Sequence, residues 1–322
     1  MALVTGRQKP QGIAVNSTTL YWAEKSSFSD SAVAMPIGGG TPVNVGSMAS
    51  FSNIVADGSN AYAASGSSCT YPDGTISDDT GQLFSTSTYL EYDQPNPSAL
   101  AVDSNYVYWV DAGTFACHWV ANNQWYFDRW SLNGSGTVQR APLGGGPGGG
   151  TIVTLVSGVD PQNSFWQPVW LAVNAHYLYW VDARGLNGIG LDGLAPSYAT
   201  VSSASIVALD ANDVYWSDAA NGTVKQMPAQ GGSVTTLASG QTPLGVISDG
   251  LDVYWVNTGT SANGYTDGAV KKVPVGGGTA TTIATVTNAS GYLALDSTSV
   301  YWTVAASNAN NEADGAVWKA SK

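Results

Sequence analysis

The sequence predicts an all-β fold, a seven-bladed β-propeller of four-stranded antiparallel blades, and three observations support this prediction. A Tyr-Trp doublet recurs seven times in 322 residues, once with Ala in place of Trp, so the repeat averages 46 residues. Asp or Asn stands five residues before the Tyr of every doublet, which keeps the turn at that point at one length. Each unit contains short apolar runs and no helical pattern, which favours blades around an axis over a solenoid. The doublets, which number the units one to seven, are Tyr21-Trp22, Tyr62-Ala63, Tyr108-Trp109, Tyr179-Trp180, Tyr215-Trp216, Tyr254-Trp255 and Tyr301-Trp302.

The fifth unit shows its four strands most clearly, from Ile206 onwards. The runs "IVAL" and "VYWS" are joined by the turn residues "DAND", and the runs "GTVKQM" and "VTTLAS" are separated by a Gly-Gly turn. These runs predict a meander of four antiparallel strands. Apolar residues are consecutive in "VYWS", so we expect both faces of this strand to be covered, with each Trp filling the gap to the next blade.

The two ends of the chain are expected to complete one blade. The last unit ends at "GAVWKASK" with three strands, whereas Ala2 to Thr5 is similar to the fourth strand "TLAS" of the fifth unit. An N-terminal strand in the last blade would remove an open sheet edge. We therefore treat residues 1–322 as a single domain closed by one N-terminal and three C-terminal strands.

The doublets with their following Asp resemble those of YWTD-type repeat propellers, as in "YWVD" at Tyr108 and Tyr179 and "YWSD" at Tyr215. More loosely, the chain is similar to bacterial secreted propeller proteins with "YW" and "P-x-GGGT" repeats. The resemblance covers nearly the whole chain and implies its architecture. The receptor YWTD domains have six blades and this chain has seven copies, so the resemblance implies neither their partners nor their binding surfaces.

Composition restricts the partner and the location. The formal charge is -12, with 11 Lys and Arg against 23 Asp and Glu, which excludes nucleic acid. No apolar run is long enough to insert into a membrane. The start "MALVTG" lacks the features of a signal peptide, so either the protein is cytoplasmic or a leader was removed before residue 1. The low lysine content and the Gly, Ser, Thr and Asn content favour a secreted, periplasmic or cell-surface protein, which we expect to be a monomer.

Loop lengths distinguish the two faces of the predicted disk. The turn between the first two strands is uniform, whereas the loops between the second and third strands vary and are longest in units two and three. The extra residues form insertions at 64–80 and 112–135, with Leu83 assigned to the third strand of unit two. Because function tends to lie on variable loops of a rigid scaffold, we expect any site on this face, over units two to four.

Cys69 and Cys117 lie in these two insertions. Their positions predict a disulfide between adjacent blades, which would contribute about 4 kcal/mol in the chain-entropy model. The alternative is two unpaired loop cysteines.

Aromatic residues in and near the insertion of unit three form the predicted ligand-binding set. These residues are Trp119, Trp125, Tyr126, Trp130, Trp166 and Trp170. An aromatic ring can stack on the apolar face of a sugar while neighbouring polar groups bind its hydroxyls. The alternative is that the insertion uses these residues to build its own small core.

His118 is one of two histidines and lies close in sequence to Tyr126, Asp128, Arg129 and Asp111. His118, Tyr126, Asp128 and Arg129 are the catalytic candidates, because a histidine beside carboxylates can act as the general acid or base of a lyase or hydrolase. Some polysaccharide lyases are seven-bladed propellers, which is an analogy of fold alone. The alternative is a loop histidine without a chemical role.

No cofactor or metal is expected. Two histidines exclude a histidine-rich site, and no spacing matches that of zinc ligands. Asp73, Asp78 and Asp79 in the insertion of unit two are the remaining calcium candidates, although Asp is also common in turns.

A set of polar residues recurs two positions after the Trp of the doublet. In units one, three, four, five and six these residues are Glu24, Asp111, Asp182, Asp218 and Asn257. Their resemblance to the Asp of the YWTD repeat implies hydrogen bonds to the neighbouring backbone, and so a structural role.

These observations favour an extracytoplasmic protein that binds a ligand on the long-loop face of units two to four. The ligand would be a carbohydrate, another small molecule or an extracellular protein. The competing hypotheses are a lyase or hydrolase with its active site at His118, and a structural surface protein. Whether the chain is an enzyme stays open at this point.

Overall fold

The computed structural model describes residues 1–25, 30–48, 51–65, 74–79, 88–94, 97–111, 116–120, 124–128, 136–143, 151–159, 170–182, 184–192, 203–305 and 314–322. These residues form β-strands and connecting turns, apart from one 3₁₀ segment, η2 (Ser261–Asn263). None of them belongs to a helix with the length and apolar character needed to cross a membrane.

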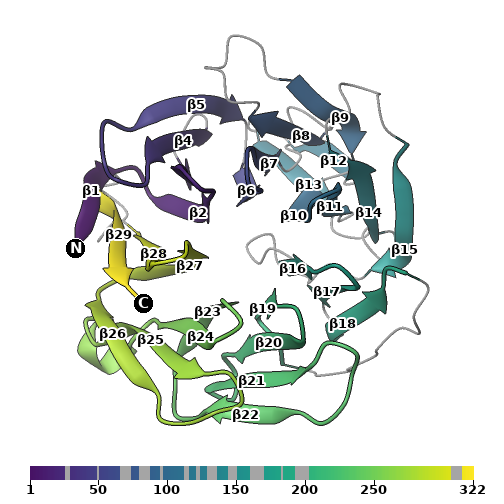
Figure 1. Cartoon of the computed structure of the whole chain (residues 1–322). Coiled ribbons are helices and arrows are strands. Elements are labelled where there is room, and N and C mark those ends of the chain that lie inside the picture. Colours follow the sequence, from purple (N-terminus) through teal and green to yellow (C-terminus); the bar gives the residue numbers. More distant parts are fainter. Residues whose placement is uncertain are drawn as a thin grey trace.

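The strands form sheets arranged around a central axis, which confirms the predicted propeller architecture (Figure 1). Among the described residues, six sheets have four antiparallel strands. The first strand of each unit lies nearest the axis. Unit one contains β2 (Pro10–Val15), β3 (Thr19–Glu24), β4 (Asp30–Pro36) and β5 (Val43–Met48). Unit two contains β6 (Phe51–Ala56), β7 (Ala61–Ser65), β8 (Gly74–Asp79) and β9 (Thr88–Gln94). Unit three contains β10 (Pro97–Val102), β11 (Tyr106–Asp111), β14 (Gly136–Pro142) and β15 (Val153–Val159). Unit five contains β19 (Ile206–Leu209), β20 (Asp213–Asp218), β21 (Thr223–Pro228) and β22 (Thr235–Ala238). Unit six contains β23 (Pro243–Ser248), β24 (Asp252–Asn257), β25 (Gly268–Pro274) and β26 (Thr281–Val286). Unit seven contains β27 (Ala289–Leu295), β28 (Ser299–Val304) and β29 (Gly315–Ser321), together with β1 (Ala2–Arg7).

In unit four, the described residues form a sheet of three strands rather than the predicted four. They are β16 (Trp170–Val173), β17 (Tyr177–Asp182) and β18 (Gly185–Gly190), and β16 contacts β10 on one side and β19 on the other. Within the described part of the chain there are therefore six four-stranded blades instead of seven, with the three-stranded sheet between two of them (Figure 1). A fourth strand of this unit would follow β18, and residues 193–202 lie outside the described residues.

The third strand of unit two is β8, which begins inside the range predicted to be an insertion. Its register pairs Ala64 with Ile76, so the assignment of Leu83 to this strand is wrong. The sequence carried a signal for the correct strand, because the Gly-Thr-Ile that opens β8 repeats the Gly-Thr-Val that precedes the buried part of β21. The segment between β7 and β8 is consequently shorter than predicted.

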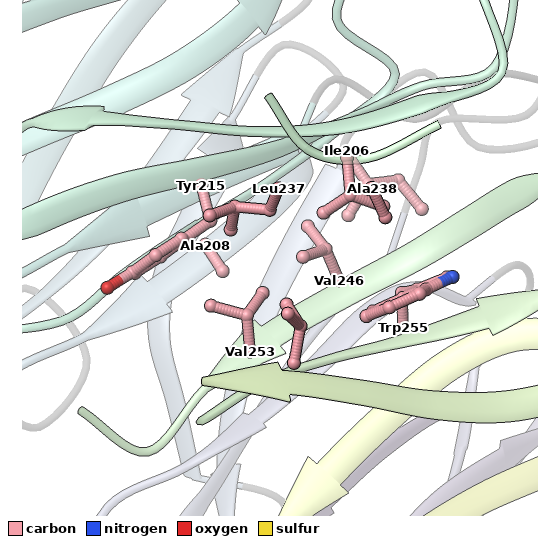
Figure 2. Close-up of a cluster of buried hydrophobic side chains, with 10 residues drawn as sticks. Ile206, Ala208, Tyr215, Leu237, Ala238, Val246, Val253 and Trp255 are labelled. Carbon is pink, nitrogen blue, oxygen red and sulfur yellow. The ribbon is translucent and has the colours of Figure 1, made fainter. Parts of the chain in front are cut away.

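Buried apolar clusters join each unit to the next. In each cluster the Tyr of one unit packs in the same group as the doublet's second residue in the following unit. Figure 2 shows one such cluster, in which Val246 and Val253 lie between Tyr215 of unit five and Trp255 of unit six. The ring closes because Tyr301 of unit seven shares a cluster with Trp22 of unit one. The predicted role of Trp as the filler between sheets is thus confirmed.

The conserved length of the first turn has a hydrogen-bonding cause. In unit five, Oδ1 of Asp210 accepts the backbone N–H groups of Asn212 and Asp213, both at 2.9 Å. Its Oδ2 accepts the hydroxyl of Tyr215 at 2.6 Å. One carboxylate therefore holds both the turn and the Tyr that packs between sheets, which is why the spacing of five residues recurs. The same Tyr-to-Asp bond occurs at Asp57, Asp103, Asp249 and Asp296.

The two ends of the chain meet in unit seven, as predicted. Strand β1 pairs antiparallel with β29, with Val4 opposite Val317. Leu3 and Val4 also pack against the buried cluster between units seven and one. The N-terminal ammonium group donates to the carbonyl of Lys319 at 2.7 Å, which adds a polar contact at the same seam.

Deletion of residues 1–6 should lower the melting temperature by about 5 °C, because it removes a strand pairing and the apolar area of Leu3 and Val4. It should also increase light scattering on heating, since β29 becomes an open edge. Circular dichroism melts and light scattering check both effects. An unchanged melting temperature would contradict the closure.

Candidate functional site at the loop face

One face of the disk carries the beginnings of the innermost strands and the ends of the second strands. The registers Pro10 to Glu24 and Pro97 to Asp111 show the two kinds of strand end lying side by side. We call this the loop face, because the loops between the second and third strands leave from it. The polar residues that follow the Trp of each doublet by two positions therefore lie at this face.

In unit one the polar residue at this position is Glu24, which is buried. Its Oε1 accepts the indole N–H of Trp22 at 2.7 Å and the Nε–H of Arg7 at 2.5 Å. The guanidinium of Arg7 also lies 5.7 Å from the centre of the Trp22 ring. The buried charge of Glu24 is thus balanced by a cation from the chain itself.

In unit five Asp218 is balanced in the same way. Burial opposes its ionisation, but the Lys225 ammonium at 2.8 Å, the Ser203 hydroxyl at 2.7 Å and the Asn221 amide outweigh this and lower the pKa to about 2. Its Oδ1 also accepts the backbone N–H of Asn221 at 3.0 Å, which confirms the backbone contact implied by the resemblance.

In unit four the buried carboxylate is also balanced by a cation, whereas in unit six the residue at this position carries no charge. In unit four, burial opposes the ionisation of Asp182. Its carboxylate accepts hydrogen bonds from Arg184 at 2.5 Å and from Asn187 at 3.0 Å, and these contacts lower its pKa. In unit six the residue is Asn257, which is neutral. Its Oδ1 accepts the indole N–H of Trp255 at 3.1 Å, and its amide donates to Gln241.

Asp111 of unit three is the exception. Its side chain is buried, with 1% relative exposure, and neither carboxylate oxygen has a hydrogen-bond partner in the described part of the chain. Burial raises its pKa to about 7, and the nearby indole of Trp109 opposes this rise without reversing it. A buried carboxyl that titrates near neutral pH is a common feature of functional sites.

The centre of the disk contains an aromatic pair. Trp170, at the start of β16, has its ring centre 5.5 Å from that of Tyr292 on β27. These strands belong to units four and seven, which face each other across the axis in Figure 1. The ring of Trp170 therefore packs on an aromatic neighbour inside the propeller. Tyr292 was absent from the sequence-based set, because no repeat pattern distinguishes it from other residues of an inner strand.

The insertion of unit three contains a two-stranded ribbon outside the blades, β12 (Ala116–Val120) and β13 (Gln124–Asp128). Its register pairs Trp119 with Trp125, and His118 with Tyr126. Residues alternate between the faces of a strand, so positions 119 and 125 share one face of the ribbon and positions 118, 126 and 128 share the other. The ribbon thus separates Trp119 and Trp125 from His118, Asp128 and also Tyr126, which was predicted both to bind ligand with the tryptophans and to act with His118.

The remaining predicted residues are placed as follows. Cys117 lies on β12, and Asp78 and Asp79 lie in β8 opposite Tyr62 and Ala61, rather than in a loop as predicted. Among the described residues no group of three or more His, Cys, Asp or Glu could hold a metal ion. The following candidates lie outside the described residues: Cys69, Asp73, Arg129, Trp130 and Trp166.

Comparisons with known proteins support the fold and no more. No family model matches the chain, and no curated protein matches it. Among solved structures, a puromycin-hydrolysing peptidase of Mycobacterium tuberculosis is 12% identical, with a TM-score of 0.62 over 92% of this chain and 50% of that one. The calcium-binding protein regucalcin of Agrobacterium tumefaciens is also 12% identical, with a TM-score of 0.52 over 100% and 94% of the two chains.

A third solved structure has a lower TM-score than these two. A nidogen/laminin complex is 16% identical, with a TM-score of 0.46 over 69% of this chain and 77% of that one, and a similarity at this level carries no argument. The chain spans half of the peptidase and nearly all of regucalcin. Because propellers with such different descriptions share this architecture, function has to be argued from the site.

Asp111→Asn should change how stability depends on pH. The folded carboxyl has a pKa raised to about 7 from an ordinary 3.8, so its stabilising contribution is complete below pH 3.8 and is lost as the pH rises through 7. Wild-type chain should lose about 4 kcal/mol of unfolding free energy between pH 4 and pH 8 from this group. The variant stays neutral, as Asn257 is in unit six, and should be the more stable protein at pH 8.

Urea unfolding at pH 4 and pH 8 measures this difference. Asp218→Asn is the matched control, because the pKa of Asp218 is lowered and its loss should destabilise the chain at pH 8. Identical pH profiles for wild type and Asp111→Asn would rule out a buried, unpaired Asp111.

Proposed function

We propose that this chain is an extracytoplasmic ligand-binding propeller whose site lies on the loop face of units two to four, with a carbohydrate as the ligand. The observation that carries the proposal is the β12–β13 ribbon, which pairs Trp119 with Trp125 on one face. Sugar-binding surfaces use such aromatic positions because C–H groups of the sugar ring stack on them. The ribbon arises between β11 and β14 of unit three, next to the end of β11 at the loop face.

The proposal includes a seventh blade. Supporting it, the three strands of unit four occupy the position between units three and five, and the Tyr-to-Trp clusters continue through them without a break. The scaffold that presents the ribbon is then a closed disk of seven units. We expect it to be a monomer.

An enzyme is the second candidate, because the ribbon register brings His118, Tyr126 and Asp128 to one face. A histidine beside a phenol and a carboxylate can transfer protons in a lyase or hydrolase reaction. The two candidates use opposite faces of the ribbon, so variants can separate them.

A disulfide between Cys69 and Cys117 would anchor the ribbon to unit two. Cys117 lies on β12, and Cys69 follows β7 in the sequence. Titration of the denatured chain without reductant should find no free thiol, and the melting temperature should fall by several degrees on reduction, since such a link is worth about 4 kcal/mol. Two free thiols would disprove the link.

Glycan-array screening followed by calorimetry tests the binding proposal. Trp119→Ala and Trp125→Ala should each weaken binding of the selected glycan by at least about fivefold, because one stacked ring contributes roughly 1 kcal/mol or more. His118→Ala should leave the affinity within about twofold of the wild type. Tyr265→Ala is the matched control, since Tyr265 is a 47% exposed aromatic on the same face in unit six.

The outcomes discriminate between the candidates. Turnover of the selected glycan that disappears in His118→Ala, with binding retained, would favour the enzyme. Binding that is unaffected by both tryptophan variants would remove the ribbon from the site.

A further inference from the structure

In units four and five, the third strand supplies a polar residue opposite the Trp of the doublet, and this residue bonds the acid at the end of the second strand. In unit five the register places Lys225 opposite Trp216, and its ammonium bonds Asp218 at 2.8 Å. In unit four Asn187 stands opposite Trp180 and bonds Asp182 at 3.0 Å. The equivalent positions thus provide an internal partner for the acid.

Unit three has the acid but not the partner. The residue opposite Trp109 is Gln139, and its amide donates to the hydroxyl of Thr137 at 3.0 Å instead of to Asp111. Both oxygens of Asp111, Oε1 of Gln139 and the indole N–H of Trp109 are buried without a partner among the described residues. Buried polar groups are nearly always paired in folded proteins, and each unpaired one is costly.

These groups lie together. Asp111 is opposite Thr137 and Trp109 is opposite Gln139, so the four residues occupy neighbouring positions on one face of the sheet. Trp109 shares its buried cluster with Tyr62 and Ala64, so this face is turned toward unit two. The unpaired groups therefore lie at the loop face, at the boundary of units two and three.

We propose that this cluster is a binding site for a primary ammonium group carried by the ligand. The ammonium takes the place that Lys225 fills in unit five, donating to Asp111 and to Oε1 of Gln139. The inference rests on the proposed function and specifies its ligand, which is a glycan containing an amino sugar with a free amine.

The donor and acceptor balance favours an organic cation. Three acceptor oxygens and one carboxylate charge match the three N–H donors and single charge of an ammonium group. A divalent metal would require more oxygen ligands than this cluster supplies. The chain's own negative charge of -12 also favours a cationic ligand.

Among the described residues, those that pair with Asp111 in its own sheet carry no charge. Pro97 is its partner on β10 and Thr137 its partner on β14, and neither is charged. Arg140 of β14 is placed differently, with its guanidinium 4.3 Å from the centre of the Tyr106 ring. Binding should therefore displace a proton from Asp111, and affinity for an ammonium group should rise about fivefold between pH 6 and pH 7.

The first arm of the test uses the cation alone. Ethylammonium chloride should raise the melting temperature of the wild type relative to sodium chloride at equal ionic strength, in phosphate buffer to avoid competing amines. The increase should be absent in Asp111→Asn and in Gln139→Lys, which supplies its own ammonium as unit five does. Asp252→Asn, which removes the same charge from the opposite face, should behave as the wild type.

The second arm uses sugars. A β-1,4-linked glucosamine tetrasaccharide should bind at least about tenfold more tightly than its N-acetylated counterpart in calorimetry at pH 7, a ratio that corresponds to 1.4 kcal/mol. This preference should vanish in Asp111→Asn and in Gln139→Lys. A folded Gln139→Lys protein that melts no lower than the wild type shows that loss of binding is not loss of structure.

Each failure has a separate meaning. Stabilisation by ethylammonium without binding of either sugar supports the ammonium site and contradicts the glycan function. Equal binding of both sugars, without an ethylammonium effect, supports the glycan function and overturns the ammonium site. A preference for the amino sugar that persists in Asp111→Asn also overturns it.

Discussion

The packing of a Tyr from one sheet against the Trp of the next is the interaction on which this structure depends. Each cluster buries one side of a sheet against its neighbour. The ring of sheets closes at the cluster that contains both Tyr301 of unit seven and Trp22 of unit one. Truncation of one such Trp would cost about 3 to 5 kcal/mol, because the gap between two sheets cannot collapse without moving their neighbours. Unit two has Ala63 at this position, and its interface with unit one is lined largely by alanines and Ile54. Closure therefore tolerates one smaller contact among larger ones.

This arrangement gives the two faces of the disk different freedom. On one face, a carboxylate such as Asp210 binds the turn and the hydroxyl of Tyr215, so a change in turn length would release the Tyr from its cluster. On the loop face, the second strand is fully paired up to its last residue, and the loop to the third strand begins only after that residue. Insertions such as the β12–β13 ribbon can therefore be accommodated there without disturbing the contacts between sheets.

The polar residues at the loop face connect this architecture with function. A carboxylate at the end of a buried strand needs a partner, and Glu24 and Asp218 obtain one from Arg7 and Lys225. Asp111 has the same position and burial, but Gln139 stands where unit five has Lys225, so the repeat leaves one charge-balancing contact unmade. Units one, four and five, which also carry a carboxylate at this position, each balance it with a cation of the chain, so the exception identifies the unit in which a ligand group would be accommodated. Unit three is also the unit that carries the ribbon.

Much of the fold followed from local pattern, because a repeated doublet, a constant turn length and short apolar runs depend only on neighbours along the chain. The β1 seam was predictable for the same reason, as the first strand resembles other fourth strands. The sequence pattern misplaced the third strand of unit two, where the Gly-Thr-Ile of β8 competed with the apolar residues around Leu83. It also placed Tyr126 in one ligand-binding set with Trp119 and Trp125, although strand pairing puts Tyr126 on the other face of the ribbon. By itself the sequence determined which elements repeat and where they differ in length. Only the tertiary structure decided that Asp111 lacks a partner and that Trp170 meets Tyr292, because both depend on contacts between residues that no local spacing brings together.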